Sequence, residues 1–163
     1  MKLYCVALAS TLLATTAVAQ SSPEPLPANY IRVTAPLAQR LTTQLLAAHP
    51  EIKKLGLHAT PVGATDNAII GSDTPGKIGK KSSAPDMVHL ASGKDFVTRI
   101  DKDGIYDLLL PITDRKGKSI GDGFIVTEVP IDKVAGPEEA LKIGAAIRDE
   151  MERLIPSKAA LYK

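Results

Sequence analysis

Residues 96–129 read FVTRIDKDGIYDLLLPITDRKGKSIGDGFIVTEV, and this stretch decides the fold because it holds three short apolar runs separated by polar turns. The runs cover residues 96–100, 106–113 and 124–129. The segments between the runs, KDG at 102–104 and DRKG at 114–117, have the composition of tight turns, which join neighbouring antiparallel strands. The stretch therefore predicts three consecutive strands of an antiparallel sheet.

Helices are predicted before and after these strands. Apolar residues at steps of four, four and three predict a helix over roughly residues 35–49, with one apolar stripe made of Leu37, Leu41, Leu45 and Ala48. A C-terminal helix over residues 137–155 is indicated by an opening proline, two glutamates in its first turn and apolar residues at helical spacing. Each stripe has to be buried against another element.

Residues 55–71 predict one more hairpin. Apolar residues alternate with others from Leu55 to Thr60, the segment PVGATD at 61–66 has turn composition, and residues 67–71 form a second run. Five strands with one long helix ahead of them and one behind are most economically arranged as a two-layer α+β domain, with the helices on one face of the sheet.

The N-terminus has the pattern of a secretory signal peptide over residues 1–19, followed by a proline-containing extended leader at 20–29. Lys2 supplies the positive start, residues 3–13 the apolar stretch, and Ala17-Val18-Ala19 the cleavage signal; an uncleaved anchor is the alternative. The only cysteine, Cys5, lies inside the signal, so no disulfide is expected. A thiol-free secreted domain favours the periplasm.

The remaining chain is expected to form a single domain over residues 30–156, with a tail at 157–163. The chain has 20 Lys and Arg against 18 Asp and Glu, and loss of Lys2 with the signal leaves 19 − 18 = +1. Such a balance gives no electrostatic reason to expect binding to nucleic acid or to an anionic membrane surface.

The loop GSDTPGKIGKKSS at residues 71–83 has the glycine spacing of a phosphate-binding loop but not its chemistry. Residue 78 is Ile where a Ser or Thr hydroxyl would be needed for Mg²⁺, and no helix can begin there because Gly79 and Pro85 follow. A better interpretation starts at Ser83, which with Asp86 forms a capping box ahead of a short helix. Lys80 and Lys81 precede that helix and could draw an anion to its N-terminus; alternatively they are simply solvated.

Several short motifs occur in an order that resembles the extracytoplasmic Cache family of PAS-like sensor domains. The resemblance covers residues 67–130 well and 35–66 more loosely, and it rests on the order of four motifs: Ile78-Gly79-Lys80, Ser92-Gly93-Lys94, Leu110-Pro111-Ile112 and Gly117-Lys118-Ser119-Ile120-Gly121.

The resemblance implies a PAS/Cache-like five-stranded antiparallel sheet with a long N-terminal helix, a short helix after the second strand and a C-terminal helix. It also implies a pocket on the sheet face away from the N-terminal helix, under residues 72–93, for a small metabolite such as a carboxylate, an amino acid or an amine. Two departures are expected. No membrane-spanning or signalling segment follows Val129, so signalling would need a separate membrane sensor or transporter, and Asp122-Gly123 predicts a bulge where the last strand should begin.

Arg99 and Asp107 are the first candidates for the ligand site. A three-residue loop at 102–104 would place Arg99 opposite Asp107 on one face of the sheet, where both could point into the pocket. The alternative is an ordinary cross-strand ion pair near the surface.

The other candidate ligand-binding residues are His58, Tyr106, Lys80, Lys81 and Ser82. His58 faces away from its apolar strand neighbours and could reach the pocket, whereas Tyr106 alternates onto the apolar face and is expected in the core with its hydroxyl at an edge. The three histidines lack metal-ligand spacing, and the DKDG turn at 101–104 lacks the ligands of a calcium loop.

The sequence as a whole predicts a periplasmic, non-catalytic small-molecule-binding domain that requires no cofactor. One alternative is a partner-binding accessory protein without a ligand. Another is a small hydrolase, which is disfavoured because no nucleophile and base can be paired from the sequence.

Overall fold

The computed structural model describes residues 25–163, and the expected signal peptide and the first part of the expected leader lie outside these residues. The elements in chain order are α1 (Pro36–Ala48), β1 (Lys54–Ala59), β2 (Ala68–Ser72), η1 (Pro75–Lys77), α2 (Ala84–Ala91), β3 (Phe96–Ile100), β4 (Ile105–Thr113), β5 (Ser119–Pro130), η2 (Ile131–Lys133), α3 (Pro137–Leu154) and η3 (Lys158–Tyr162). Within residues 25–163, no helix combines the length and the apolar character that crossing a bilayer requires.

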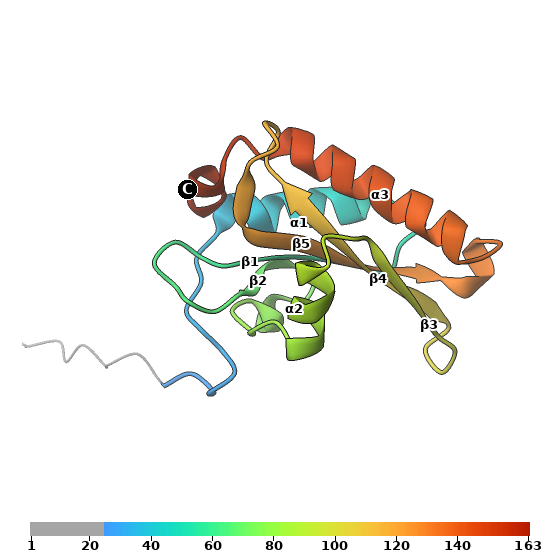
Figure 1. The fold of residues 1–163 in the computed structure, drawn as a ribbon, viewed down its shortest axis with the longest axis horizontal. Helices are drawn as coiled ribbons and strands as arrows, with labels where there is room; N and C mark the ends of the chain where they lie inside the picture. The colour runs from blue at the N-terminus through green and yellow to red at the C-terminus, as the bar shows by residue number, and fades with distance from the viewer. Residues whose placement is uncertain (1–24) are drawn as a thin grey trace, which may run out of the picture.

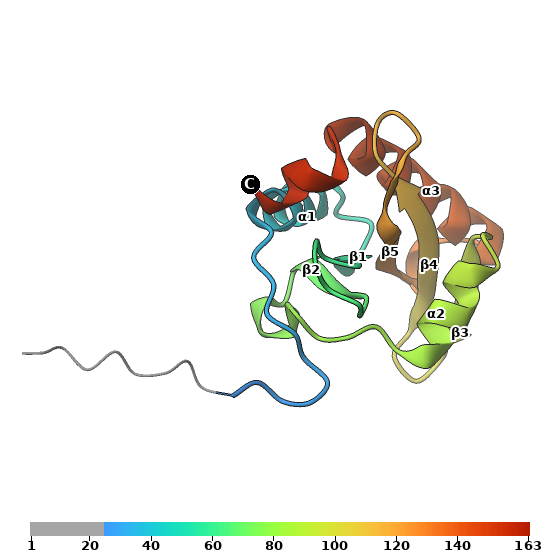
Figure 2. The same cartoon turned by 60° about the vertical axis from the view of Figure 1, so that its left-hand side comes forward.

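The strands form one five-stranded antiparallel sheet in the order β2-β1-β5-β4-β3. Helices α1 and α3 cover one face of this sheet, and the short helix α2 lies over the other (Figure 1). The turned view shows the same two layers, with η3 beside α1 (Figure 2). The predicted α+β, PAS-like architecture is therefore confirmed, including the N-terminal helix, the short helix after β2 and the C-terminal helix.

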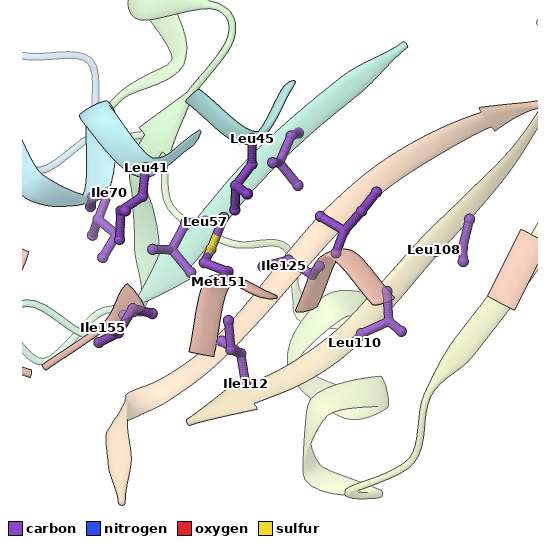
Figure 3. Close-up of a cluster of buried hydrophobic side chains, with 14 of the residues drawn as sticks. Leu41, Leu45, Leu57, Ile70, Leu108, Leu110, Ile112, Ile125, Met151 and Ile155 are labelled. Atoms are coloured by element: carbon purple, nitrogen blue, oxygen red, sulfur yellow. The ribbon is translucent and has the colours of Figure 1, made fainter. Parts of the chain in front are cut away.

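The main core lies between the sheet and the layer of α1 and α3. Alternate strand residues point to this side because successive side chains of a strand face opposite ways. Figure 3 shows how they meet the helix stripes, with labels on Leu41 and Leu45 of α1, on Met151 of α3, on Ile155 after it, and on the strand residues Leu57, Ile70, Leu108, Leu110, Ile112 and Ile125. All are nearly or fully buried.

Helix α1 can approach β2 closely because residue 71 is glycine. A Cβ atom at this position would lie 2.6 Å from Oγ1 of Thr42 and 2.7 Å from the carbonyl oxygen of Ala38. The helix backbone therefore occupies the space that any other side chain at residue 71 would need.

The start of β5 carries the predicted bulge. Pro111 of β4 pairs with Phe124 of β5, and Thr113 pairs with Ser119. Between these two pairs β5 has more residues than β4, and the extra residues form the bulge. Asp122 has a φ of 49°, in the left-handed region. The bulge is confirmed, and β5 begins at Ser119 rather than at residue 124 because the chain pairs again before the bulge.

Residues 157–163 belong to the packed domain, which corrects the expectation of a tail. They form η3, whose Leu161 is fully buried in the main core. The predicted C-terminal helix ends at Leu154, and the chain then turns so that this last apolar side chain can be removed from water.

Candidate functional site

The sheet face turned toward α2 carries charged and small residues where the other face carries leucines. In β1, Leu55 and Leu57 face the main core, so the intervening Lys54, Gly56 and His58 face α2. This alternation places ionisable groups beneath the segment between β2 and β3.

Three of these groups form a row across neighbouring strands. Lys54 pairs in register with Glu128 of β5, and Glu128 pairs with Asp107 of β4. The ammonium group of Lys54 forms an ion pair with the Glu128 carboxylate. Residues directly opposite each other have Cβ atoms about 5 Å apart, so the three side chains adjoin.

A cavity of about 180 Å³ lies over this row. Its walls include Lys54, His58, Asp107 and Glu128 from the sheet and Asp73 from the loop after β2, and Gly56 lies among them. The nearest atom to a Cβ built on Gly56 would be Nε2 of His58, at 3.6 Å, so a methyl group there would make ordinary van der Waals contacts, and glycine keeps side-chain atoms out of this part of the cavity. The volume equals that of about six water molecules, at roughly 30 Å³ for each, so the cavity suits a small ligand.

The electrostatics of the cavity are set by burial and by the mutual influence of its charges. Burial, together with the nearby Glu128 carboxylate, raises the pKa of Asp107 to about 6, although Lys54 acts in the opposite direction. The pKa of Lys54 is raised, chiefly by its hydrogen bond to Glu128 and further by the charges of Asp73 and Asp107. The protonation of Asp107 and Lys54 therefore depends on the charges of the neighbouring residues in the row.

His58 is held by a chain of hydrogen bonds that begins at a backbone carbonyl. The Asn67 amide nitrogen donates to the carbonyl oxygen of Asp122 at 2.6 Å, the Ser82 hydroxyl donates to Oδ1 of Asn67 at 2.7 Å, and Nδ1 of His58 lies 2.8 Å from the Ser82 oxygen. Each side chain comes from a different part of the chain, so the network ties β1, β2 and the loop before α2 together.

The direction of this chain fixes the tautomer of His58. A carbonyl can only accept, so the side-chain nitrogen of Asn67 must face Asp122 and its oxygen must accept the Ser82 proton. Ser82 then has no proton left for His58, and Nδ1 of His58 must be the donor. Nε2 consequently carries a lone pair, and it has no hydrogen-bond partner among residues 25–163.

His58 remains neutral over the physiological pH range. Burial lowers its pKa to about 4, and only 7% of the residue is exposed. Its ring stacks on Phe124 with the ring centres 4.3 Å apart. The residue is therefore a rigid, uncharged hydrogen-bond acceptor at the wall of the cavity.

Replacing Ser82 by alanine is expected to lower the free energy of unfolding by about 1.5 kcal/mol, because it leaves buried hydrogen-bonding atoms of His58 and Asn67 without their partner. Chemical denaturation measures this change. The exposed Ser119→Ala serves as the matched control and is expected to change stability by less than about 0.5 kcal/mol. Equal effects of the two substitutions would contradict the network.

A larger recess, of about 450 Å³, lies at the start of α3 but is a weaker candidate. Its walls come from Ala135 to Lys142, a single run of the chain. Glu138 and Glu139 already supply negative charge to this helix N-terminus. In the smaller cavity over the sheet, by contrast, charged side chains from three strands and from the segment after β2 meet.

The β3–β4 hairpin differs in register from the prediction by one residue. Ile100 pairs with Ile105, so the loop has four residues, 101–104, and Arg99 lies opposite Tyr106. The prediction that Arg99 faces Asp107 is therefore wrong, because a shift of one residue moves a side chain to the other face of the sheet. The turn begins at Ile100, whose carbonyl oxygen accepts from the Asp103 amide.

Arg99 lies at the surface, away from the cavity. Its Nε atom donates to Asp101 at 2.7 Å and its Nη1 atom donates to the Tyr106 hydroxyl at 3.3 Å. The Arg99 side chain is 53% exposed. Tyr106 is buried in the main core with its hydroxyl at the edge, as predicted for a core residue, and neither residue lines the cavity.

The two lysines before α2 are engaged elsewhere. Nζ of Lys81 lies 3.0 Å from the Asp66 carboxylate, and the backbone of Lys80 pairs with Tyr30. The capping box of Ser83 and Asp86 is present with both of its hydrogen bonds, at 3.2 and 3.0 Å. The cap thus supplies hydrogen bonds at the α2 N-terminus without help from the two lysines. Neither lysine lines the cavity.

The site therefore combines predicted and unpredicted residues. Asp107 and His58 line the cavity, and Ser82 positions His58. The cavity also contains four residues that were not predicted as site residues: Lys54, Gly56, Asp73 and Glu128. Lys54 and Glu128 gave one usable signal, since each is a charged residue within a strand and directly precedes a buried apolar residue. No group of three His, Cys, Asp or Glu side chains in the described part of the chain is arranged to hold a metal ion.

No family model, no curated protein and no solved structure matches this chain. What the site binds has to be inferred from its own residues.

Proposed function

We propose that the chain is a non-catalytic, small-molecule-binding protein of the sensor type, with its ligand in the cavity over the sheet. The observation that carries this proposal is the cavity itself, which has Gly56 in its wall and in which charged side chains from three strands and from the segment after β2 meet. Concave sites with a few convergent polar groups are the usual form of small-ligand sites.

The proton arrangement at Ser82 supports binding rather than hydrolysis. A serine nucleophile needs a base that accepts its proton, but the Ser82 proton is committed to Asn67 and the facing nitrogen of His58 is a donor. The low pKa of His58 also makes it a poor base at neutral pH.

A periplasmic location and a separate membrane partner form part of the same proposal. They rest on the expected signal peptide at residues 1–19 and on the resemblance to Cache domains. The five-stranded antiparallel sheet, with the cavity on its face away from α1, is consistent with that resemblance and supports it.

A ligand screen by thermal unfolding tests the proposal. A ligand at about ten times its dissociation constant should stabilise the protein by roughly 1.4 kcal/mol, which raises Tm by several degrees. Gly56→Leu is expected to abolish this shift because its side chain fills the cavity. Gly56→Ala is the matched control and is expected to keep part of the shift, since its single methyl group makes ordinary contacts.

Two outcomes would overturn the proposal. One is a broad set of small carboxylates, amino acids, amines and neutral polyols in which no compound raises Tm at millimolar concentration. The other is a ligand whose shift survives Gly56→Leu unchanged. Circular dichroism of both variants shows whether the fold is retained.

A further inference from the structure

The polar atoms available in the cavity are mostly hydrogen-bond acceptors. Nε2 of His58 carries a lone pair without a partner, on a side chain that is more than nine-tenths buried. Oδ1 of Asp73 is also buried, and it makes no hydrogen bond among the described residues. An unpaired buried acceptor such as Oδ1 of Asp73 is rare in native proteins and calls for an explanation such as a missing ligand, whereas Nε2 of His58 is an accessible acceptor on a residue that lines the cavity.

The charges of the cavity also favour a ligand that is positively charged. Its walls carry three carboxylates, on Asp73, Asp107 and Glu128, against two ammonium groups, on Lys54 and Lys77. Lys54 is already paired with Glu128. Lys77 is then the one other cation against Asp73 and Asp107, so one negative charge remains once Asp107 is ionised.

We propose that the cavity binds a compact cation with N–H donors, of the primary ammonium class, lying against Asp73, Asp107 and the Nε2 atom of His58. This inference rests on the proposed small-molecule-binding function. An ammonium group carries three N–H donors and one positive charge, which matches three acceptors and the excess negative charge. The cavity has the volume of about six water molecules, which limits the ligand to a small molecule.

Three probes that share the group HOCH₂– isolate the role of charge. The rest of the molecule is –CH₂NH₃⁺ in ethanolamine, –CH₂OH in ethylene glycol and –COO⁻ in glycolate. Isothermal titration and thermal unfolding in millimolar probe suit ligands of this size. Ethanolamine is expected to bind at least tenfold more tightly than either of the others, and tetramethylammonium, a cation without N–H donors, is expected to bind as weakly as ethylene glycol.

The dependence on pH gives a second readout. The charges that act on Asp107 are those of Glu128, Lys54 and Asp86, and together with burial they leave it largely protonated at pH 5 in the empty protein. Because an ammonium group favours the ionised carboxylate, ethanolamine affinity is expected to fall about tenfold from pH 7 to pH 5. His58 stays neutral over this range and does not contribute. Asp107→Asn should weaken binding at pH 7 and remove most of the pH dependence.

The outcomes separate this inference from the function on which it rests. Tighter binding of glycolate, or equal binding of ethanolamine and ethylene glycol, overturns the cation inference and leaves small-molecule binding in place. Binding of ethanolamine that Asp107→Asn leaves unchanged overturns the assigned position. Absence of binding by these probes and by every compound of the broader screen overturns both proposals.

Discussion

Gly71→Ala is expected to lower the free energy of unfolding by about 3 kcal/mol. The new Cβ atom would lie 2.8 Å or less from the carbonyl group of Ala38 and from Oγ1 of Thr42. Both are parts of α1, and Thr42 is itself fixed by a hydrogen bond from its hydroxyl to the Ala38 carbonyl oxygen, at 2.9 Å. The helix would have to move away from β2, which would loosen the packing of Leu41 and Leu45 in the core.

Gly56→Ala is the matched control because it adds the same methyl group to the neighbouring strand. Its nearest contact would be 3.6 Å, an ordinary van der Waals distance. Its stability should therefore stay within about 1 kcal/mol of the wild type, with the loss of glycine flexibility in the unfolded chain acting in its favour. Urea denaturation of both variants measures the difference. A Gly71→Ala protein as stable as Gly56→Ala would show that α1 does not lie where the structure places it.

The architecture could be predicted from the sequence because its signals are local. Period-two alternation, turn composition and helical apolar spacing each depend on a few consecutive residues. The strands of the 96–129 stretch, the bulge near Asp122 and the capping box of α2 were all accessible in this way. The order of the strands in the sheet was not predicted, because it depends on pairings between segments that are distant in sequence.

The site could be predicted only in part because it depends on register. One extra residue in the loop at 101–104 turned Arg99 away from Asp107 and toward the surface. Composition did not distinguish a three-residue from a four-residue loop, since Gly104 has a positive φ of 65° that suits the end of either. The row of Lys54, Glu128 and Asp107 likewise requires the pairing of three strands that are distant in sequence. Long-range pairings of this kind leave no trace in a local pattern.

Asp107→Asn is expected to make the protein more stable by about 2 kcal/mol at pH 8 and to leave its stability nearly unchanged at pH 4. Folding raises the Asp107 pKa from 3.8 to about 6, so the unfolded state loses the proton more readily. The free energy of unfolding therefore falls as pH rises from about 4 to about 6. The pKa difference sets an upper limit of about 3 kcal/mol on this loss, and the expected 2 kcal/mol is smaller because Asp107 is only partly buried. An amide has the same shape and never ionises. Lys54 keeps Glu128 as its partner in the variant.

In the Asp107→Asn variant, the free energy of unfolding should rise with pH because of His58, which is opposite to the effect of Asp107 in the wild type. Its pKa is 6.5 when unfolded and about 4 in the folded protein, so below pH 6.5 the unfolded state takes up a proton that the folded state refuses. Stability due to His58 therefore rises with pH, by about 3 kcal/mol between pH 4 and pH 6.5. In the wild type, Asp107 has the opposite slope over nearly the same window, and the two contributions largely cancel.

Urea denaturation at half-unit intervals from pH 4 to pH 8 tests both effects. The difference between the variant and the wild type isolates Asp107, because His58 and the other titrating groups cancel, whereas the rise with pH in the variant's own unfolding free energy reports His58. The difference in unfolding free energy should grow from near zero at pH 4 to its plateau above pH 6. Asp103→Asn, on the exposed β3–β4 turn, should give a small difference with no such step. A flat difference for Asp107→Asn would mean that its carboxyl group is hydrated as in the unfolded chain. The cavity would then be too wet to hold the charges and the unpaired His58 acceptor on which ligand binding depends.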